Sequence, residues 1–373
     1  TTFLSTAIKF VYNYNLRELS NLLGGLTLIT PEACKNPKFY VSAWMHEVCR
    51  VFKDRLISRD DLDLFDTLMV AACKDNFTDA SLGEPNEIYD PTNPPVWAHY
   101  ADVNAEGVYA CSKGMAEMKQ IISEGLDRYN ETYAMMDLVL FEDALIHVTK
   151  VTRVLLSPSG NMLMVGVGGS GKQSLSRLAA FMAAFDTFRM EITSGYGVLE
   201  LREDFKELYV KAGQRNIPVI FLFTDLQILD ERFLCLFNDY ISCGNIPDII
   251  PKEDIDTVLN AQRGECKSAG LGEDRDVLFN WFIEKTRRNL KMVLCFSPVG
   301  DGMRIRSQRF SAIVTGCVID WFQPWPEEAL LSVAANFMAE VPDLGDDEAR
   351  GNVVKFIAFA QTMMEEVNVQ FKK

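Results

Sequence analysis

The 373-residue chain contains 37 basic and 52 acidic residues, which gives a formal net charge of −15 at pH 7. This acidity argues against a nucleic-acid partner or an anionic membrane, while a 48% apolar content is sufficient for a sizeable globular core. No apolar run reaches the roughly 18 residues that a membrane-spanning helix needs, and the N-terminus lacks a signal-peptide pattern, which decides little if the chain is a fragment.

Cysteine and histidine show no metal-binding or disulfide spacing. The three histidines, His46, His99 and His147, are far apart, and no Cys-x-x-Cys pair occurs. We therefore predict reduced core thiols in a cytosolic protein, rather than a disulfide or zinc framework, and histidines that are not metal ligands. The nine cysteines are Cys34, Cys49, Cys73, Cys111, Cys235, Cys243, Cys266, Cys295 and Cys317.

The first 80 residues read as helical. Residues 3–12 are largely apolar, and residues 15–23 form an amphipathic pattern that is expected to stop at Gly24 and Gly25. Residues 39–56 place their apolar side chains on one face, and residues 60–73 are a further amphipathic candidate. We interpret residues 1–80 as a helical lid or bundle.

A break follows, and then more helices. Residues 76–97 are rich in proline and glycine, so a linker is expected over residues 81–100. Residues 114–133 are charged and helical in pattern, residues 135–141 form an apolar run, and residues 142–156 predict another helix.

The most informative stretch lies between residues 162 and 177. The apolar run 162–165 predicts a short strand buried on both faces, and helical spacing resumes from about Gly171. Between them lies Gly166-Val167-Gly168-Gly169-Ser170-Gly171-Lys172, which matches G-x-x-x-x-G-K. A glycine loop between a strand and a helix is the context of a phosphate-binding loop rather than of an ordinary turn.

The residue types of this loop fit a polyphosphate ligand. Glycines let backbone N–H groups approach the phosphates, and the helix N-terminus adds partial positive charge. Lys172 supplies a mobile cation. However, Gln173 occupies the position where Ser or Thr normally holds Mg²⁺, and the hydroxyl comes one residue later, at Ser174. The Gln173 amide oxygen is a weaker candidate metal ligand.

The remaining pattern alternates strands with helices. Strands are expected at residues 187–192, 217–223, 291–296 and 312–319, and helices at 199–216, 231–242, 252–262 and 274–289. This order predicts an α/β fold with a doubly wound parallel sheet and a ligand at the C-terminal ends of its strands. Residues 321–326 break the pattern, and helices 327–341 and 346–371 read as the start of a second lid.

Hydrolysis needs a carboxylate for Mg²⁺ and another that orients water, both at the end of a central strand. After residues 217–223 the chain reads Thr224-Asp225-Leu226. In one register Thr224 takes the metal position and Asp225 the base position; in the other Asp225 takes the metal position and Leu226 the base position. Either register lacks a pair, and a third reading makes Asp225 a cap of the following turn.

Two further features of the sequence give weaker evidence for residues that contact a nucleotide. Ser297 ends the next strand, where a polar residue can sense the terminal phosphate. Arg304, Arg306 and Arg309 are either arginine fingers for a neighbouring subunit or a solvated, ion-paired loop.

Several motifs, in the same order, resemble one family. The segments GVGGSGKQSLSRLAA (166–180), MDLVLFEDA (136–144), ITSGY (192–196), FTD (223–225), CFSPVG (295–300) and DWFQPWP (320–326) resemble the fourth AAA+ module of an axonemal dynein heavy chain, with the outer-arm type as first choice. NLRELS (15–20), together with residues 46–47 and 50–55, is similar to the lid of the third module. The resemblance covers nearly the whole chain.

The resemblance implies a P-loop AAA+ fold flanked by helical lids: a lid of the preceding module (1–80), a linker (81–100), the large α/β domain (101–320) and the start of a truncated lid (321–373). It also implies that residues 166–174 bind the phosphates of ATP or ADP, with Mg²⁺ held through Gln173 and Asp225 if at all. Val139 and Leu140 would pack near adenine, and Asp225 would be the catalytic residue. Arg17 would face the nucleotide of the third module, and Gly316 stands where an arginine finger is often found.

The resemblance also implies partners and a place in the cell. These are the other AAA+ modules of the same heavy chain, microtubules through a stalk outside this segment, and dynein intermediate and light chains, in the cytoskeleton of the ciliary or flagellar axoneme. We expect nucleotide binding with weak or no hydrolysis and a regulatory or structural role. The alternatives are a free-standing P-loop ATPase or kinase, and a scaffold without nucleotide.

Overall fold

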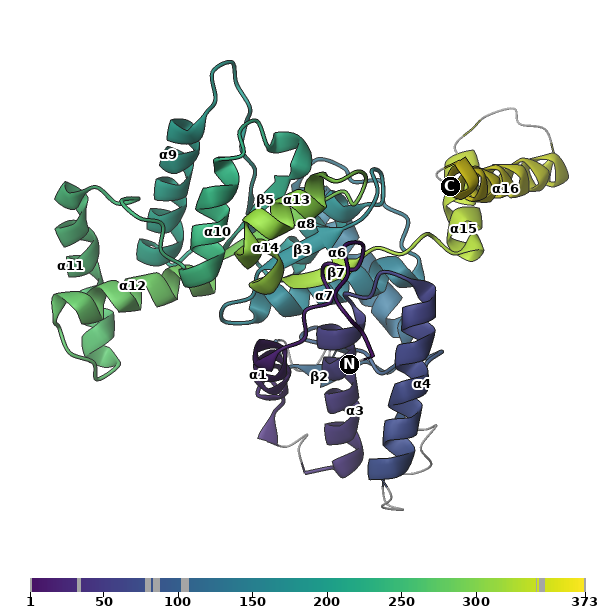
Figure 1. Ribbon diagram of the computed structural model, residues 1–373, viewed down its shortest axis with the longest axis horizontal. Coiled ribbons are helices and arrows are strands. Elements are labelled where there is room, and N and C mark those ends of the chain that lie inside the picture. Colours follow the sequence, from purple (N-terminus) through teal and green to yellow (C-terminus); the bar gives the residue numbers. More distant parts are fainter. Residues whose placement is uncertain are drawn as a thin grey trace.

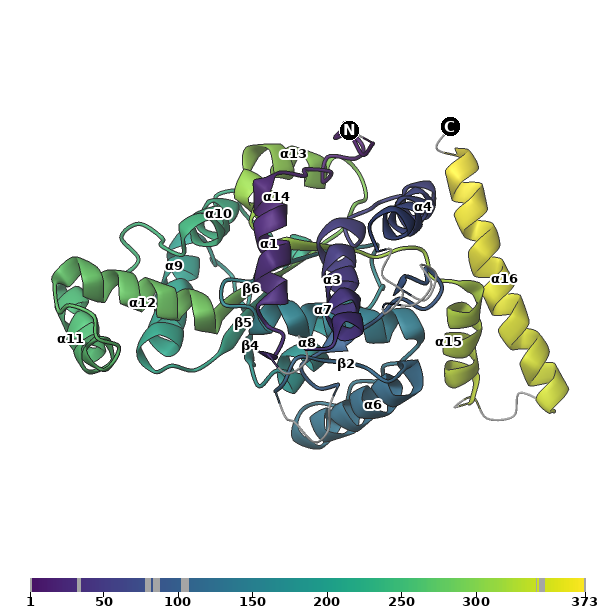
Figure 2. The same cartoon turned by 90° about the horizontal axis from the view of Figure 1, so that it is seen from below.

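The computed structural model describes residues 2–31, 35–77, 82, 88–101, 107–339, 341 and 346–371. Figure 1 shows an N-terminal helical unit, a central α/β domain and a C-terminal helical hairpin that projects from it. The view from below in Figure 2 places α15 and α16 beside each other, apart from the helices that cover the sheet. Within the described residues, no helix is long and apolar enough to cross a membrane.

The central domain is built on a five-stranded parallel sheet in the order β4-β5-β6-β3-β7. Its strands are β3 (Met162–Val165), β4 (Asp186–Phe188), β5 (Val219–Thr224), β6 (Leu290–Phe296) and β7 (Val318–Trp321). Every residue of β3, β5 and β6 is buried, which explains their apolar runs. Because β3 lies between β6 and β7, the loop that follows it emerges inside the sheet rather than at an edge.

Alternate residues of the strands pack into two separate cores, one on each face of the sheet. Met162 and Met164 of β3 pack into a core with α6 (Met115–Thr132), α7 (Glu142–Leu156) and α8 (Lys172–Met182). Leu163 and Val165 belong to the opposite core, which contains α9 (Val198–Tyr209), α10 (Phe233–Cys243) and α12 (Arg275–Asn289). The sheet is therefore covered on both faces, as a doubly wound fold requires.

The remaining elements of the described residues complete the fold. They are α1 (Leu16–Leu26), α3 (Pro37–Val48), the π-helix η1 (Cys49–Lys53), α4 (Arg59–Asn76), β1 (Trp97–Ala98), β2 (Ala110–Cys111), the π-helix η3 (Val210–Gln214), the 3₁₀-helix η4 (Asp225–Gln227), α11 (Lys252–Ser268), α13 (Gly302–Arg309), α14 (Ser311–Thr315), α15 (Glu327–Ala339) and α16 (Asp347–Phe371). β1 and β2 pair antiparallel.

The N-terminal unit is joined to α7 by a buried ion pair. Glu47 of α3 is fully buried and pairs with Arg153 of α7, while Tyr109 donates its hydroxyl to Glu47 Oε1 at 2.6 Å. Burial opposes the charge of Arg153, but the carboxylate of Glu47 outweighs it and raises the pKa of Arg153. Arg153 therefore stays charged in the seam between the N-terminal unit and the α/β domain.

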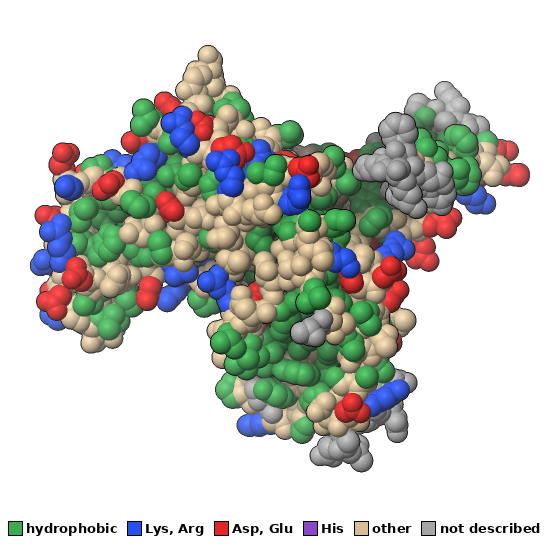
Figure 3. Space-filling model, viewed as in Figure 1, with side chains coloured by type: hydrophobic (Ala, Val, Ile, Leu, Met, Phe, Trp, Pro, Cys, Tyr) green, Lys and Arg blue, Asp and Glu red, His purple; other side chains and the backbone are tan. Residues whose placement is uncertain are grey.

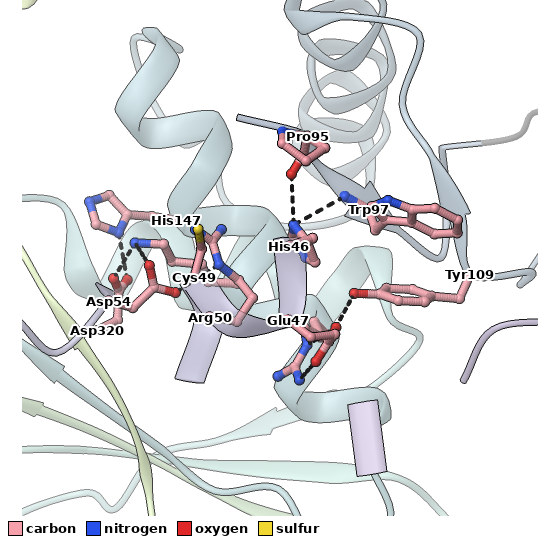
Figure 4. Close-up of polar contacts among 12 residues, drawn as sticks. His46, Glu47, Cys49, Arg50, Asp54, Pro95, Trp97, Tyr109, His147 and Asp320 are labelled. Atoms are coloured by element: carbon pink, nitrogen blue, oxygen red, sulfur yellow. Dashed lines mark hydrogen bonds and ion pairs between the residues drawn. The ribbon is translucent and has the colours of Figure 1, made fainter. Parts of the chain in front are cut away.

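A second ionic cluster crosses the same seam. Lys150 of α7 bridges Asp54 Oδ1 at 3.1 Å and Asp320 Oδ1 of β7 at 2.9 Å, and His147 contacts Asp320 through Nδ1. Although burial disfavours its charge, His147 and Lys150 hold the pKa of Asp320 well below its usual range. Figure 4 draws both clusters, with Arg50, Asp54, His147 and Asp320 on one side of His46 and Glu47 and with Tyr109 on the other.

Backbone contacts extend this seam to the edge of the sheet. Trp321 N donates to Asp54 O at 3.0 Å, and Gln323 Nε2 donates to Leu56 O at 2.9 Å. The segment that follows η1 therefore lies directly beside the C-terminal end of β7.

Several expected elements differ from the structure. Residues 3–12, which were expected to be helical, form no helix, and α1 continues through Gly24 and Gly25 to Leu26 instead of stopping before them. The strand expected at residues 187–192 is Asp186–Phe188, because only these residues pair with β5. Cys235 and Cys243 are exposed rather than core thiols, while Cys49, Cys73, Cys266, Cys295 and Cys317 are buried; Cys34 lies outside the described residues.

The strand expected at residues 312–319 is wrong in its first half. Ser311–Thr315 forms the short helix α14, and only Val318–Trp321 is a strand. Ile313 and Val314 are buried in the core that contains α10, and a Cβ on Gly316 would lie 2.5 Å from Ile241 Cγ2. Packing against α10 thus overrides the strand preference of the β-branched run.

An apolar surface covers part of the N-terminal unit. Figure 3 shows mostly hydrophobic side chains on the lower lobe, where Figure 1 places α1 and α3. On α1 the side chains of Leu16, Leu19 and Leu23 are exposed at helical spacing, and Phe39 of α3 is exposed as well. An apolar stripe of this kind is typical of a face that another protein surface covers.

Candidate functional site

The loop between β3 and α8 has the backbone shape of an anion cradle. Gly169 and Gly171 have φ angles of +78° and +81°, values at which a side chain is strained. A Cβ on Gly168 or Gly169 would meet no atom within 4 Å, so this part of the loop faces open space. The loop leads into the N-terminus of α8 at Lys172, whose free N–H groups favour an anion.

Gly166 is required for a different reason. A Cβ at this position would lie 2.7 Å from Phe322 Cβ, and the Ser170 hydroxyl oxygen is 3.0 Å away. The start of the loop is therefore pressed against the segment that follows β7.

Lys172 folds back over its own loop. Its ammonium group donates to Gly166 O and Val167 O, both at 2.7 Å, and to Ser170 Oγ at 3.0 Å. Burial lowers the pKa of Lys172. The cation thus lies over the cradle, and the residues present fit a phosphate group. Directly after Lys172, Gln173 and Ser174 are half-buried, and Arg177 Nη2 donates to Ser174 Oγ at 3.5 Å.

The end of β5 is less well equipped for chemistry. Thr224 N and Thr224 Oγ1 donate to Gln227 Oε1, at 2.9 and 3.2 Å, so Thr224 caps the turn. Asp225 Oδ2 accepts the backbone N–H of Ser297 at 2.9 Å, and Leu226 is 85% exposed. Among the described residues no group of three or more His, Cys, Asp or Glu side chains could hold a metal ion. The donors offered to Mg²⁺ are therefore few.

Asp225 and Ser297 come together because β5 and β6 are neighbours in the sheet. The Ser297 hydroxyl accepts the N–H of Val299 at 3.3 Å, so it shapes its own turn. Asp225 also lies near enough to Lys172 to favour the charge of its ammonium group. The lysine of the loop, the carboxylate after β5 and the serine after β6 thus lie at one edge of the sheet.

A cavity of about 610 Å³ opens from the loop. Gly169, Ser170, Gly171 and Ser174 line it on the loop side, and Val139 lines it as well. Leu140 does not, because its side chain is buried in the core with α6–α8. Of Val139 and Leu140, which were both expected to pack near adenine, only Val139 therefore lines the cavity.

Sequence reasoning missed much of the cavity wall. Phe141 and Trp325 both line it and contact each other edge-on, with ring centroids 5.2 Å apart, and Phe337 of α15 adds a third aromatic ring. In the sequence, residues 321–326 break the alternation of strands and helices and belong to a family motif, but neither feature places them at the cavity. Trp325 lies between Pro324 and Pro326, and a tryptophan held by two prolines is a usable signal for a rigid apolar wall.

The N-terminal unit supplies a second wall that was also missed. Lys53, Asp54, Arg59 and Leu62 line the same cavity as the loop glycines. No sequence pattern assigns these residues to the loop's cavity, since they precede the loop by more than 100 positions and reach it only through the seam with the α/β domain.

The remaining predicted residues lie elsewhere. Arg17 donates to Thr315 O at 2.9 Å, on the side of α14, and does not line the cavity. The arginine cluster forms part of helix α13 rather than a loop: Arg304 pairs with Asp301 at 3.0 Å, and Arg306 and Arg309 pair with Glu231 at 3.0 and 3.6 Å. Their contacts agree with the ion-paired interpretation.

Comparison with known proteins gives two family matches. Residues 136–373 match the P-loop containing dynein motor region D4, and residues 1–87 match an AAA+ lid domain. The chain is 44% identical over its full length to the dynein alpha chain of the flagellar outer arm of Chlamydomonas reinhardtii. It is 41% identical over 98% of its length to mouse dynein axonemal heavy chain 17 and to the ciliary dynein beta chain of Tripneustes gratilla. It spans 8% of the length of each of these relatives.

Proposed function

The chain belongs to the axonemal dynein heavy-chain family, and on that premise we propose that its glycine loop binds ATP or ADP and hydrolyses it slowly or not at all. The role that follows is regulatory or structural. Bound nucleotide would tie the α/β domain to α15, because Phe337 and Val333 of that helix line the same cavity as the loop.

Binding is supported by the loop itself. The two left-handed glycines, the open space before Gly168 and Gly169, and the Lys172 ammonium group form a site for phosphates. Backbone N–H groups of residues 168–172 and Lys172 would hold the phosphates, and Val139, Phe141 and Trp325 would enclose the base. When bound, the nucleotide supplies a polyphosphate chain that Mg²⁺ usually accompanies.

Weak hydrolysis is supported by one observation above all. The only carboxylate at the end of β5, Asp225, already accepts the N–H of Ser297, and the next side chain is the exposed apolar Leu226. Neither a second carboxylate nor a hydroxyl directly after Lys172 is present for metal and water. Asp225 and Gln173 would supply only part of the ligand set that a Mg²⁺ ion needs.

The wider context is a proposal as well, since the chain spans 8% of its relatives. The exposed leucine stripe of α1 would be covered by another AAA+ module of the same heavy chain. The complete protein would be a microtubule motor of the ciliary or flagellar axoneme, with intermediate and light chains as further partners.

Calorimetric titration of the chain with Mg-ADP tests the binding proposal. We expect saturable binding that Lys172→Ala removes and that Lys119→Ala, an exposed lysine on α6, leaves unchanged. An absence of heat at millimolar nucleotide would instead support the scaffold without nucleotide. Turnover of ATP at several per second by the same protein would contradict slow hydrolysis and support an autonomous ATPase.

A further inference from the structure

The cavity beside the glycine loop belongs to two structural units at once. One wall comes from the α/β domain and the other from the N-terminal helical unit, through Lys53, Asp54, Arg59 and Leu62. A ligand that fills this cavity therefore contacts residues that lie more than 100 positions before the loop that holds its phosphates.

The cationic side chains that line this cavity differ in whether they have an ion-pair partner. Lys53 pairs with Asp66 at 2.6 Å, Arg50 with Asp54 at 2.9 Å, and Lys150 with Asp54 and Asp320. The side chain of Arg59 makes no ion pair or hydrogen bond with any described residue, and it is exposed. Arg59 is thus the lining cation whose guanidinium group is free to bind a ligand.

The position of Arg59 indicates which end of a nucleotide it would meet. Val165, the last residue of β3, pairs with Trp321 of β7, and Trp321 N in turn donates to Asp54 O. The segment that leads to Arg59 therefore lies two strand spacings, about 10 Å, from the strand that ends at the loop. It is on the β7 side, together with Trp325 and Phe141, which the proposed function places around the base.

We propose that Arg59 is a nucleotide-contacting residue that the preceding helical unit supplies to this site, with its guanidinium group against the ribose and base. This inference rests on the nucleotide binding proposed above. A guanidinium group can donate to ribose hydroxyls and stack on a purine, so it favours a complete nucleotide over a bare diphosphate. Because the ligand then touches both units, its binding also stabilises the seam between them.

The test compares two ligands on matched variants of the whole chain. Calorimetry would measure the affinity of wild type, Arg59→Ala and Lys74→Ala for Mg-ADP and for Mg-pyrophosphate. Lys74 lies on the same helix at its far end and is exposed, so it controls for the loss of one surface charge. Arg59→Met, which keeps the aliphatic stem, serves as a second variant, and thermal unfolding checks that each variant is folded.

We expect both Arg59 variants to bind ADP roughly tenfold more weakly, with pyrophosphate affinity and the Lys74→Ala variant unchanged. An unchanged ADP affinity in both Arg59 variants would overturn this inference and leave the proposed function intact. An equal loss for both ligands would overturn the nucleoside assignment, since it would show a general effect of charge. If wild type binds neither ligand, both this inference and the proposed function are wrong.

Discussion

Among individual residues, Gly25 shows how closely the N-terminal unit approaches α7. A Cβ at Gly25 would lie 1.7 Å from Glu47 Oε2 and 2.8 Å from Arg153 Nη2. The helix α1 passes directly over the buried ion pair, and only a residue without a side chain fits there.

Gly25→Ala is therefore expected to destabilise the protein by about 2–4 kcal/mol, despite the better helix propensity of alanine, because the ion pair must separate. Urea denaturation followed by circular dichroism would measure this. Gly24→Ala is the matched control, since a Cβ at that position meets nothing within 4 Å, and it should be neutral or stabilising. Equal stability of the two variants would contradict the packing described for α1.

Lys291 is a second residue whose environment should have a measurable effect, here on how stability depends on pH. It is fully buried in β6, and its side-chain nitrogen donates to Ser157 O, Pro158 O and Arg287 O at 2.6, 2.9 and 3.0 Å. Burial, with the nearby Arg287 and Arg288, lowers the pKa of Lys291 to about 7. In the unfolded chain the pKa returns to about 10.4.

Between pH 7 and 10 the unfolded chain consequently binds more protons at this position than the folded one. The free energy of unfolding should therefore rise with pH across this window, by at most about 1.4 kcal/mol per pH unit from this group, and should show no such rise below pH 7. Lys291→Met removes the titrating group, so we expect wild type to gain stability relative to this variant between pH 7 and 9 in urea denaturation. Parallel pH profiles would show that the pKa of Lys291 is not lowered.

At this scale the sequence predicts residues whose role is local. The glycines and Lys172 of the loop follow from spacing alone, because the site is built from consecutive backbone groups. Arg59, Phe141 and Trp325 do not, because their place in the cavity depends on how distant elements pack. Leu140 shows the converse, since it is adjacent to Val139 in sequence but is buried in the core.

Among the elements, β5 and β6 are linked at their ends by Asp225. Its carboxylate accepts the N–H of Ser297 at 2.9 Å and so fixes the turn after β6. If this contact is its main role, its loss should affect stability more than nucleotide affinity.

We expect Asp225→Ala to lower the free energy of unfolding by about 1–2 kcal/mol, because a half-buried N–H loses a charged acceptor. Asp225→Asn keeps an acceptor and should recover most of this loss. In both variants Mg-ADP affinity should stay within about threefold of wild type, as measured by calorimetry. A variant that unfolds like wild type but loses Mg²⁺-dependent ATP turnover would instead identify Asp225 as a catalytic base.

Long apolar runs predict the elements well, and short ones do not. The expected strands at 217–223 and 291–296 match β5 and β6 within two residues, because strands buried on both faces must be apolar throughout. Residues 312–315 have a similar composition but form α14, since Ile313 and Val314 pack in the core with α10. The apolar composition of residues 312–315 therefore predicts that they are buried, but packing against α10 determines that they form a helix rather than a strand.

For the molecule as a whole, two ionic clusters join the N-terminal unit to the α/β domain. Glu47–Arg153 and Asp54–Lys150–Asp320 both join the N-terminal unit to α7, and Glu47, Asp54, Arg153 and Asp320 are buried. Removing one partner leaves an unpaired buried charge, which costs more than the pair contributes.

Glu47→Ala should therefore destabilise the chain by about 3–5 kcal/mol and separate the unfolding of its two parts. In wild type, circular dichroism and tryptophan fluorescence should give coincident urea transitions, and in the variant two distinct midpoints. Glu207→Ala, which removes an exposed glutamate of α9, should behave like wild type. Coincident transitions in Glu47→Ala would show that the seam does not couple the parts.

The hydrogen bond from Trp321 N to Asp54 O has a consequence for shortened versions of this chain, because it covers an edge of the sheet. β7 is the last strand of the sheet, and the polypeptide around Asp54 shields part of its outer margin. A recombinant fragment trimmed to start after residue 100 would leave that margin bare, ready to pair with the same strand of another copy. Such a fragment should aggregate or precipitate under conditions in which the 373-residue chain remains in solution.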